Sequence, residues 1–145
     1  MSEFSSGTTH IEAPIEQVSE ILNDLANYPS WSSTIKKVEI EEGSGSAQPT
    51  KVTVKIEAGV LKDRATLLYD WSQAPGKISF SLEDADLLTE MSGSYLLKDN
   101  GDDTTDVTYQ LKVGISMPVP EMMRKKQEES TISQMLAQLK SKAES

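Results

Sequence analysis

The sequence predicts an α+β fold in which an antiparallel sheet is covered by a long C-terminal helix. Two helical segments flank a central stretch of strand-like runs and turns, and they begin at Pro14 and after Pro120. A run of antiparallel strands leaves one apolar face that another element must cover, and the last helix is the only large element left to do so. A curved sheet closed over such a helix commonly encloses a cavity.

The N-terminal part predicts a β-strand followed by a short, half-buried helix. Residues 3–11 have β character, and Pro14 suits the first turn of a helix because its missing N–H costs nothing there. Apolar residues then recur at three- and four-residue spacing at Ile15, Val18, Ile21, Leu22 and Leu25. Pro29 interrupts this pattern, so we expect a short irregular or helical turn around Trp31.

Period-two alternation from residue 35 onward predicts the remaining strands, about seven in all. Residues 50–58 show it most clearly, because Val52, Val54 and Ile56 alternate with polar side chains. The other runs are 35–41, 63–72, 77–82, 87–97 and 107–113, separated by turns that include a Gly/Ser-containing hairpin loop at 42–49. One face of the sheet is therefore apolar and the other polar.

The C-terminal helix, predicted from residue 121 to about residue 142, has one irregularity. Its second half bears an apolar stripe, whereas residues 124–131 are polar, and the stripe extended backwards passes Lys125 and Glu128. Either these side chains form exposed ion pairs at the rim, or the helix covers a partly polar, water-filled cavity at this level. Rim pairing is the simpler interpretation because exposed ion pairs are common.

Composition and charge exclude several classes of function. The 145 residues fit one domain, so we treat residues 1–145 as a single domain. The net charge of −9 repels phosphate backbones, which argues against nucleic acid as a partner.

No apolar run approaches the ~20 residues of a membrane span. Because the first residues do not resemble a secretory signal, we expect a cytoplasmic protein without stable membrane insertion.

Sequence motifs for catalysis, cofactors or metals are not found. The chain has no cysteine, and His10, its one histidine, has no motif that would supply a nucleophile or a second metal ligand. No serine lies in a Gly-x-Ser-x-Gly motif. The acidic run at 99–103 lacks the terminal glutamate of a calcium-binding loop. We therefore predict no catalytic residue, no cofactor and no metal.

The apolar interior is the remaining candidate site. Tyr and Trp can orient a flat or long apolar ligand, although core packing alone explains why aromatic side chains face inward. The adjacent methionines at 122–123 either line a cavity entrance or pack against the sheet. The predicted ligand-pocket residues are Trp31, Val54, Leu67, Tyr69, Trp71, Phe80, Tyr95, Tyr109, Leu111, Met122 and Met123.

Four segments together resemble a known family. They are "IEAPIEQVSEILNDLANYPSW", "AGVLKDRATLLYDW", "GSYLLKDNGDDTTDVTYQLKV" and "MPVPEMMRKK". Their order and spacing are similar to those of the polyketide cyclase/dehydrase and lipid-transport superfamily (START-like, or SRPBCC), near its coenzyme-Q-binding branch. The resemblance implies a helix-grip fold: a seven-stranded antiparallel sheet curved around a long C-terminal helix, with two short helices after the first strand. The run 128–130 departs from the family, whose cavity-facing helix is more apolar.

The resemblance also implies a function. We expect intracellular binding or transport of a hydrophobic small molecule, such as a lipid, an isoprenoid quinone or a polyketide, between the sheet and the C-terminal helix. One alternative is an aromatase/cyclase-like enzyme in which a tyrosine or Arg64 assists proton transfer, although the alternation puts Arg64 on the face opposite Tyr69. Another is a regulatory module that binds a protein partner. Binding without chemistry is the leading hypothesis.

Overall fold

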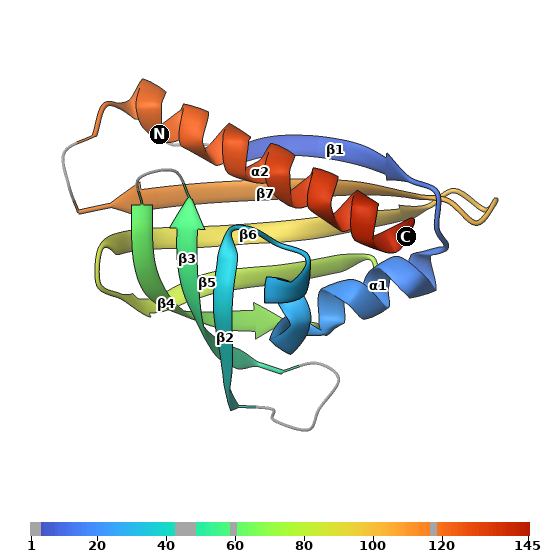
Figure 1. Ribbon diagram of the computed structural model, residues 1–145, viewed down its shortest axis with the longest axis horizontal. Helices are drawn as coiled ribbons and strands as arrows, with labels where there is room; N and C mark the ends of the chain where they lie inside the picture. Colours follow the sequence, from blue (N-terminus) through green and yellow to red (C-terminus); the bar gives the residue numbers. More distant parts are fainter. Residues whose placement is uncertain (1–3, 43–48, 59–60, 117–118) are drawn as a thin grey trace.

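The computed structural model describes residues 4–42, 49–58, 61–116 and 119–145, so most of the loop predicted at 42–49 lies outside the described residues. Within them, a seven-stranded antiparallel sheet curves around a C-terminal helix, which confirms the predicted fold (Figure 1). The elements are β1 (Ser5–Ile11), α1 (Ile15–Asn23), the 3-10 helix η1 (Leu25–Ser30), β2 (Ile35–Glu42), β3 (Lys51–Ala58), β4 (Leu61–Asp70), β5 (Lys77–Ala85), β6 (Leu88–Asp99), β7 (Thr105–Ile115) and α2 (Glu121–Ala143).

The strands pair in the order β1-β7-β6-β5-β4-β3-β2, and each neighbouring pair is antiparallel. Consecutive strands from β2 to β7 are therefore neighbours, whereas β1 pairs with the last strand, with Thr8 opposite Thr108. Side chains alternate between the two faces of a strand. In β7 this alternation buries Val107, Tyr109 and Leu111, as the sequence pattern predicts.

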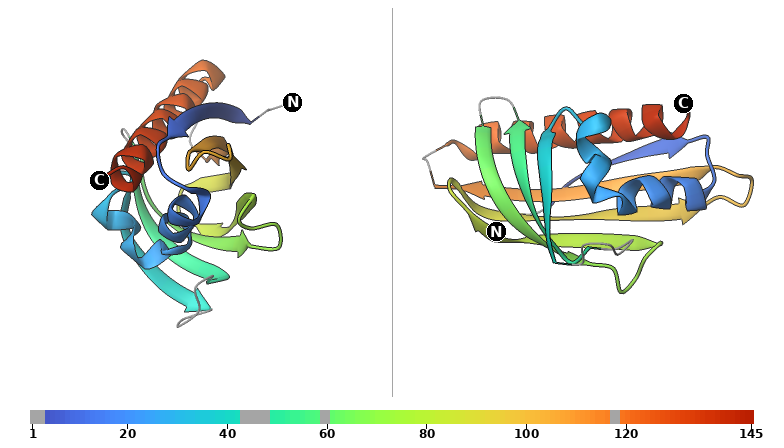
Figure 2. Two further views of the ribbon diagram at one scale, coloured as in Figure 1. Left: turned by 90° about the vertical axis from the view of Figure 1, so that its right-hand side faces the viewer. Right: turned by 60° about the horizontal axis from the view of Figure 1, so that its bottom comes forward.

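The helix α2 packs on β1 and β7 and lies within the curve of the sheet (Figure 2). Its second half buries Ile132, Met135, Leu136 and Leu139. Its other flank contacts the segment before β2, where Ser32 Oγ donates a hydrogen bond to Met135 Sδ at 3.0 Å. Gln138 Nε2 donates to Ser33 Oγ at 2.8 Å in the same segment. The helix therefore joins the two ends of the curved sheet.

The two short helices α1 and η1 follow β1 and lie near the C-terminal end of α2 (Figure 1). Val18, Leu22 and Leu25 of the predicted apolar stripe are buried, and Ile15 and Ile21 are half-buried. The Tyr28 hydroxyl donates to the Leu22 carbonyl oxygen at 2.6 Å. Gln17 Nε2 donates to the Ala143 carbonyl oxygen at 2.6 Å, and Lys140 Nζ donates to the His10 carbonyl oxygen at 2.6 Å. These contacts fix the C-terminal end of α2 on the junction between β1 and α1.

Candidate ligand-binding site

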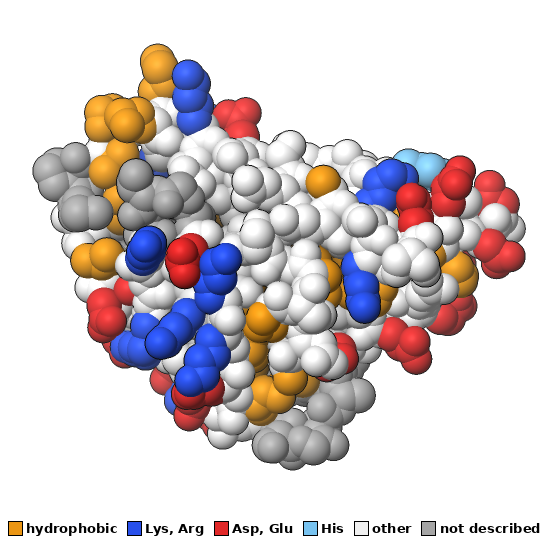
Figure 3. Space-filling model, in the orientation of Figure 1, with side chains coloured by type: hydrophobic (Ala, Val, Ile, Leu, Met, Phe, Trp, Pro, Cys, Tyr) orange, Lys and Arg blue, Asp and Glu red, His pale blue; other side chains and the backbone are white. Residues whose placement is uncertain are grey.

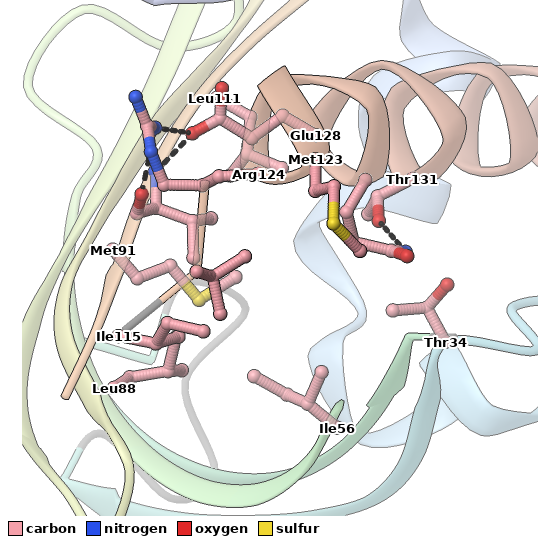
Figure 4. A pocket seen from close by; sticks show the side chains of 13 residues that line it. Thr34, Ile56, Leu88, Met91, Leu111, Ile115, Met123, Arg124, Glu128 and Thr131 are labelled. Atoms are coloured by element: carbon pink, nitrogen blue, oxygen red, sulfur yellow. Dashed lines mark hydrogen bonds and ion pairs between the residues drawn. The ribbon is translucent and has the colours of Figure 1, made fainter. Parts of the chain in front are cut away.

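A cavity of about 170 Å³ lies between the first half of α2 and the end of the sheet where β6 begins and β7 ends (Figure 4). Its apolar lining residues are Ile56, Leu88, Met91, Leu111, Val113, Ile115, Val119 and Met123. Its polar lining residues are Thr34, Arg124, Gln127, Glu128 and Thr131. An engineered apolar cavity of about 150 Å³ in another protein binds benzene, so this volume suits a small ring system.

The cavity reaches the first turn of α2. Met123 lines the cavity, yet 61% of it is exposed, and the neighbouring Met122 is 73% exposed. Figure 3 shows apolar side chains gathered at the end of the molecule where α2 begins. Methionine side chains are flexible and polarizable, so they adapt to guests of different shape. Met123 therefore links the lining of the cavity to the surface at this end of the helix, where a cavity entrance is one of the two roles expected from the sequence.

A buried ion pair forms one side of the cavity (Figure 4). The Glu128 side chain is 1% exposed and the Arg124 side chain 16%. Arg124 Nη1 donates to Glu128 Oε2 at 2.7 Å and to the Val113 carbonyl oxygen at 2.9 Å. The Glu128 carboxylate also accepts from the Val113 N–H at 2.6 Å and from Ser5 Oγ at 2.8 Å. The buried carboxylate is thus both paired and hydrogen-bonded, as its burial requires.

This ion pair lies where β7 extends past the start of β1. Ser5, the first residue of β1, is opposite Leu111, so Val113 lies beyond the last described pair of the two strands. An unpaired backbone N–H or C=O in a buried strand costs free energy. Glu128 and Arg124 supply the acceptor and the donor that a neighbouring strand would provide, which explains why α2 is polar here.

The inward stripe of α2 therefore continues through Arg124, Glu128 and Thr131, at four- and three-residue spacing, while Lys125 is exposed. The interpretation of Glu128 as part of an exposed rim pair is wrong, because the carboxylate faces the cavity. Within the run 128–130, which departs from the apolar character expected of the family, Glu128 is buried because it supplies the acceptor for β7, whereas Glu129 and Ser130 are exposed. The sequence does carry a signal for this polar lining: Arg124 and Thr131 lie four residues before and three residues after Glu128, and such residues share one face of a helix.

The predicted pocket residues are distributed between the cavity and the core. Leu111 and Met123 line the cavity, and Met122, next to Met123 in the chain, is exposed. Val54 and Leu67 are buried in the core. Trp31 is half-buried beside a separate, shallow hollow that η1 forms with the ends of α1 and α2. Alternation along the strands was not sufficient to find the lining residues from β6 and the end of β7.

The predicted aromatic residues of the strands pack on one another. Neighbouring ring centroids lie between 4.4 and 6.4 Å apart in the order Trp71, Tyr69, Phe80, Tyr109 and Tyr95. The last pair is stacked, with an angle of 7° between its ring planes. This aromatic row crosses the middle strands, and none of its members is among the described lining residues of the cavity. Core packing accounts for their inward direction.

Burial raises the pKa of all four tyrosines above the ordinary value near 10. The unfolded chain therefore releases these phenolic protons first. The protonated tyrosines therefore favour the folded state over the unfolded one. Their contribution to the free energy of unfolding is complete below about pH 10 and is lost progressively as the pH rises from there towards the folded-state pKa values. We expect tyrosinate absorbance to appear in one cooperative step that coincides with loss of far-ultraviolet circular dichroism. Ionisation of the tyrosines in a protein that is still folded would contradict this expectation.

The other candidate groups for acid–base chemistry lie outside the cavity. Arg64 pairs with Asp84 at 3.1 Å and with Asp86 at 3.4 Å, so it cannot assist proton transfer on a ligand in the cavity. His10 pairs with Asp106 at 2.8 Å on the surface.

Among the residues that the structure describes, no group of three or more His, Asp or Glu side chains is placed to hold a metal ion. No helix in the described ranges is long and apolar enough to cross a membrane.

A curved antiparallel sheet around a C-terminal helix, with an apolar cavity between them, defines the helix-grip class of START-like folds. The family model for polyketide cyclase / dehydrase and lipid transport matches residues 5–144. The chain therefore belongs to this family. No curated protein matches the chain in sequence.

Solved structures show the same fold. A START superfamily protein from Mycobacterium smegmatis is 23% identical, with a TM-score of 0.90 over 99% of this chain and 98% of that one. The Zhui aromatase/cyclase from Streptomyces sp. R1128 is 20% identical, with a TM-score of 0.81 over 98% and 93%. A conserved protein from Geobacillus kaustophilus is 14% identical, with a TM-score of 0.78 over 95% and 93%. These similarities establish the fold.

Proposed function

We propose that the protein binds a hydrophobic small molecule in the cavity between its sheet and α2, without catalysing a reaction on it. The observation that supports this proposal is a largely apolar cavity of about 170 Å³ whose lining includes the exposed Met123. Residues 1–145 then act as one ligand-binding domain, which we place in the cytoplasm. The acidic net charge of −9 argues against nucleic acid as its partner.

The size of the cavity sets the part of the ligand that is buried. A lipid, an isoprenoid quinone or a polyketide would place one ring or a short apolar segment inside, and the remainder would pass Met123 to the surface. Burial of about 150 Å² of apolar ligand surface contributes ~4 kcal/mol. This contribution alone corresponds to about a thousandfold in affinity, so the proposal does not depend on an ion pair between protein and ligand.

An aromatase/cyclase reaction is the second candidate, because the Zhui aromatase/cyclase has the same fold. General acid–base catalysis needs a titratable group within hydrogen-bond reach of the substrate. Among the described lining residues, the ionisable groups are Arg124 and Glu128, and both are engaged with each other and with Val113. This arrangement favours binding over catalysis.

Native mass spectrometry of protein purified without organic solvent tests the proposal. We expect a bound neutral compound that solvent extraction removes, and a stripped protein that binds N-phenyl-1-naphthylamine at one to one with increased probe fluorescence. A protein that purifies empty and leaves the fluorescence of the probe unchanged would refute ligand binding. Conversion of a poly-β-keto substrate would favour the enzyme instead, and recovery of one stoichiometric protein that is insensitive to ligand would favour a partner-binding module.

A further inference from the structure

We propose that the ligand has a neutral hydroxyl or carbonyl group at its buried end and that Thr34 binds this group. The inference rests on the proposed function, because it names the chemical class of ligand for the same cavity. It follows from one unsatisfied hydroxyl, from the residues around it, and from the pairing of the charged groups in the lining.

Thr34 lies between η1 and β2, lines the cavity and is 3% exposed, yet its Oγ1 has no hydrogen-bond partner among the described residues. Buried hydroxyls in folded proteins nearly always have a partner. Other buried threonines of this chain follow that rule: Thr105 Oγ1 donates to the Ala13 carbonyl oxygen at 2.9 Å, and Thr66 Oγ1 lies 3.0 Å from Thr53 Oγ1. Thr34 is therefore an exception among the buried threonines, and it lies where a guest in this cavity could complete its bonding; the other unpartnered buried atom, Asn23 Oδ1, lines a separate hollow.

Thr34 belongs to a polar corner of the cavity that also contains Gln127 and Thr131. Figure 4 shows Thr34 and Thr131 on the same side of the pocket, one from the residue just before β2 and one from α2. Gln127 Nε2 donates to Thr131 Oγ1 at 3.3 Å, so the Thr131 hydroxyl, unlike that of Thr34, already has a partner. Because Thr34 Oγ1 is unpartnered, rotation about its Cα–Cβ bond breaks no hydrogen bond when the hydroxyl turns towards a ligand.

The charges around the cavity require the polar group of the ligand to be neutral. Within the described lining, the charged residues are Arg124 and Glu128, which are paired with each other on the side of the pocket opposite Thr34 (Figure 4). A carboxylate or phosphate in the polar corner would find hydroxyl and amide groups but no unpaired cation. Burial of an anion without a counter-charge is strongly unfavourable.

Three bicyclic probes of similar size separate these requirements: naphthalene, 2-naphthol and 2-naphthoate. Binding of naphthalene leaves the Thr34 hydroxyl unsatisfied, whereas 2-naphthol gains a hydrogen bond to a group that had none. We expect the wild-type protein to bind 2-naphthol about threefold to tenfold more tightly than naphthalene. We expect 2-naphthoate, which is charged at neutral pH, to bind at least about tenfold more weakly than 2-naphthol.

Thr34→Val should abolish the preference for 2-naphthol and leave the naphthalene affinity within about twofold, because valine keeps the shape and removes the hydroxyl. Thr34→Ser should retain the preference. Thr34→Val should not lower the urea midpoint of unfolding, since the hydroxyl has no partner to lose. The matched control is Thr105→Val, which loses the bond to Ala13, should lower the midpoint and should leave the probe preference unchanged.

The outcomes distinguish this inference from the proposed function. Equal affinity of the wild-type protein for 2-naphthol and naphthalene, or a preference that survives Thr34→Val, overturns the role of Thr34 and leaves ligand binding in place. Tightest binding of 2-naphthoate overturns the requirement for a neutral group. Failure of all three probes to bind removes the proposed function, and this inference with it.

Discussion

Replacement of Glu128 by alanine is expected to lower the free energy of unfolding by about 3–5 kcal/mol. The largely buried Arg124 guanidinium would lose its close partner and keep only the exposed Glu121 carboxylate, 3.6 Å away, and the Val113 N–H and the Ser5 hydroxyl would lose their acceptor. A domain of this size is stable by only about 5–15 kcal/mol. One substitution at the wall of the cavity would therefore remove a large part of the total stability.

Urea denaturation followed by circular dichroism measures this loss, and the next residue of α2 supplies a matched control. Glu129 is exposed, so Glu129→Ala should change the stability by no more than about 0.5 kcal/mol. The double variant Arg124→Met/Glu128→Leu should recover part of the loss, because it removes both charges together. Similar shifts for Glu128→Ala and Glu129→Ala would show that the buried pair does not hold the helix on β7.

The second large effect is expected for ligand affinity on replacement of Ile115 by tryptophan. Ile115 is half-buried at the end of β7 and lines the cavity, so an indole ring there would occupy the space that the ligand needs. The probe would lose most of the ~4 kcal/mol that apolar burial provides. We expect the affinity for naphthalene, measured by titration calorimetry, to fall by at least about 100-fold.

Leu82→Trp is the control for this experiment. Leu82 is a half-buried residue of β5 that does not line the described cavity, so the same ring placed there should leave naphthalene binding unchanged. Both variants should keep the circular dichroism spectrum of the wild-type protein. Normal naphthalene binding by a folded Ile115→Trp variant would mean that the ligand site lies elsewhere.

The architecture could be predicted from the sequence because its signals are local. Pro14 and Pro120 precede the two α-helices as their N-caps, and period-two alternation gives the strands with their buried faces. The predicted helix from 121 to about 142 agrees with the observed Glu121–Ala143. Proline restricts the backbone only of itself and its neighbours, and the alternation of polar and apolar residues is read within one strand. A single sequence is therefore sufficient to locate these elements.

The lining of the cavity could be predicted only in part, because it depends on the distance between two layers. Alternation puts Tyr109 and Leu111 on the same face of β7, but it does not show that one meets other aromatic rings while the other meets open space. The role of Glu128 depends on where β1 begins relative to β7. This register is set by pairing between strands that are far apart in the chain, so a local pattern does not reveal it. Thr34 gave no signal, since a lone threonine before a strand is ordinary.

The pairing of the first strand with the last has a consequence for synthesis of the protein. Thr8 and Thr108 bond across 100 positions of the chain, so β1 leaves the ribosome long before its partner exists. At about 5–20 residues per second, the nascent chain spends several seconds with the concave side of its incomplete sheet uncovered. The helices α1 and η1 cover part of that side, but the part over β1 and β7 waits for α2, and such distant contacts make assembly slow. We therefore expect the sheet to reach its final packing only once α2 is available, and the incomplete chain to be more prone to aggregation than the finished one.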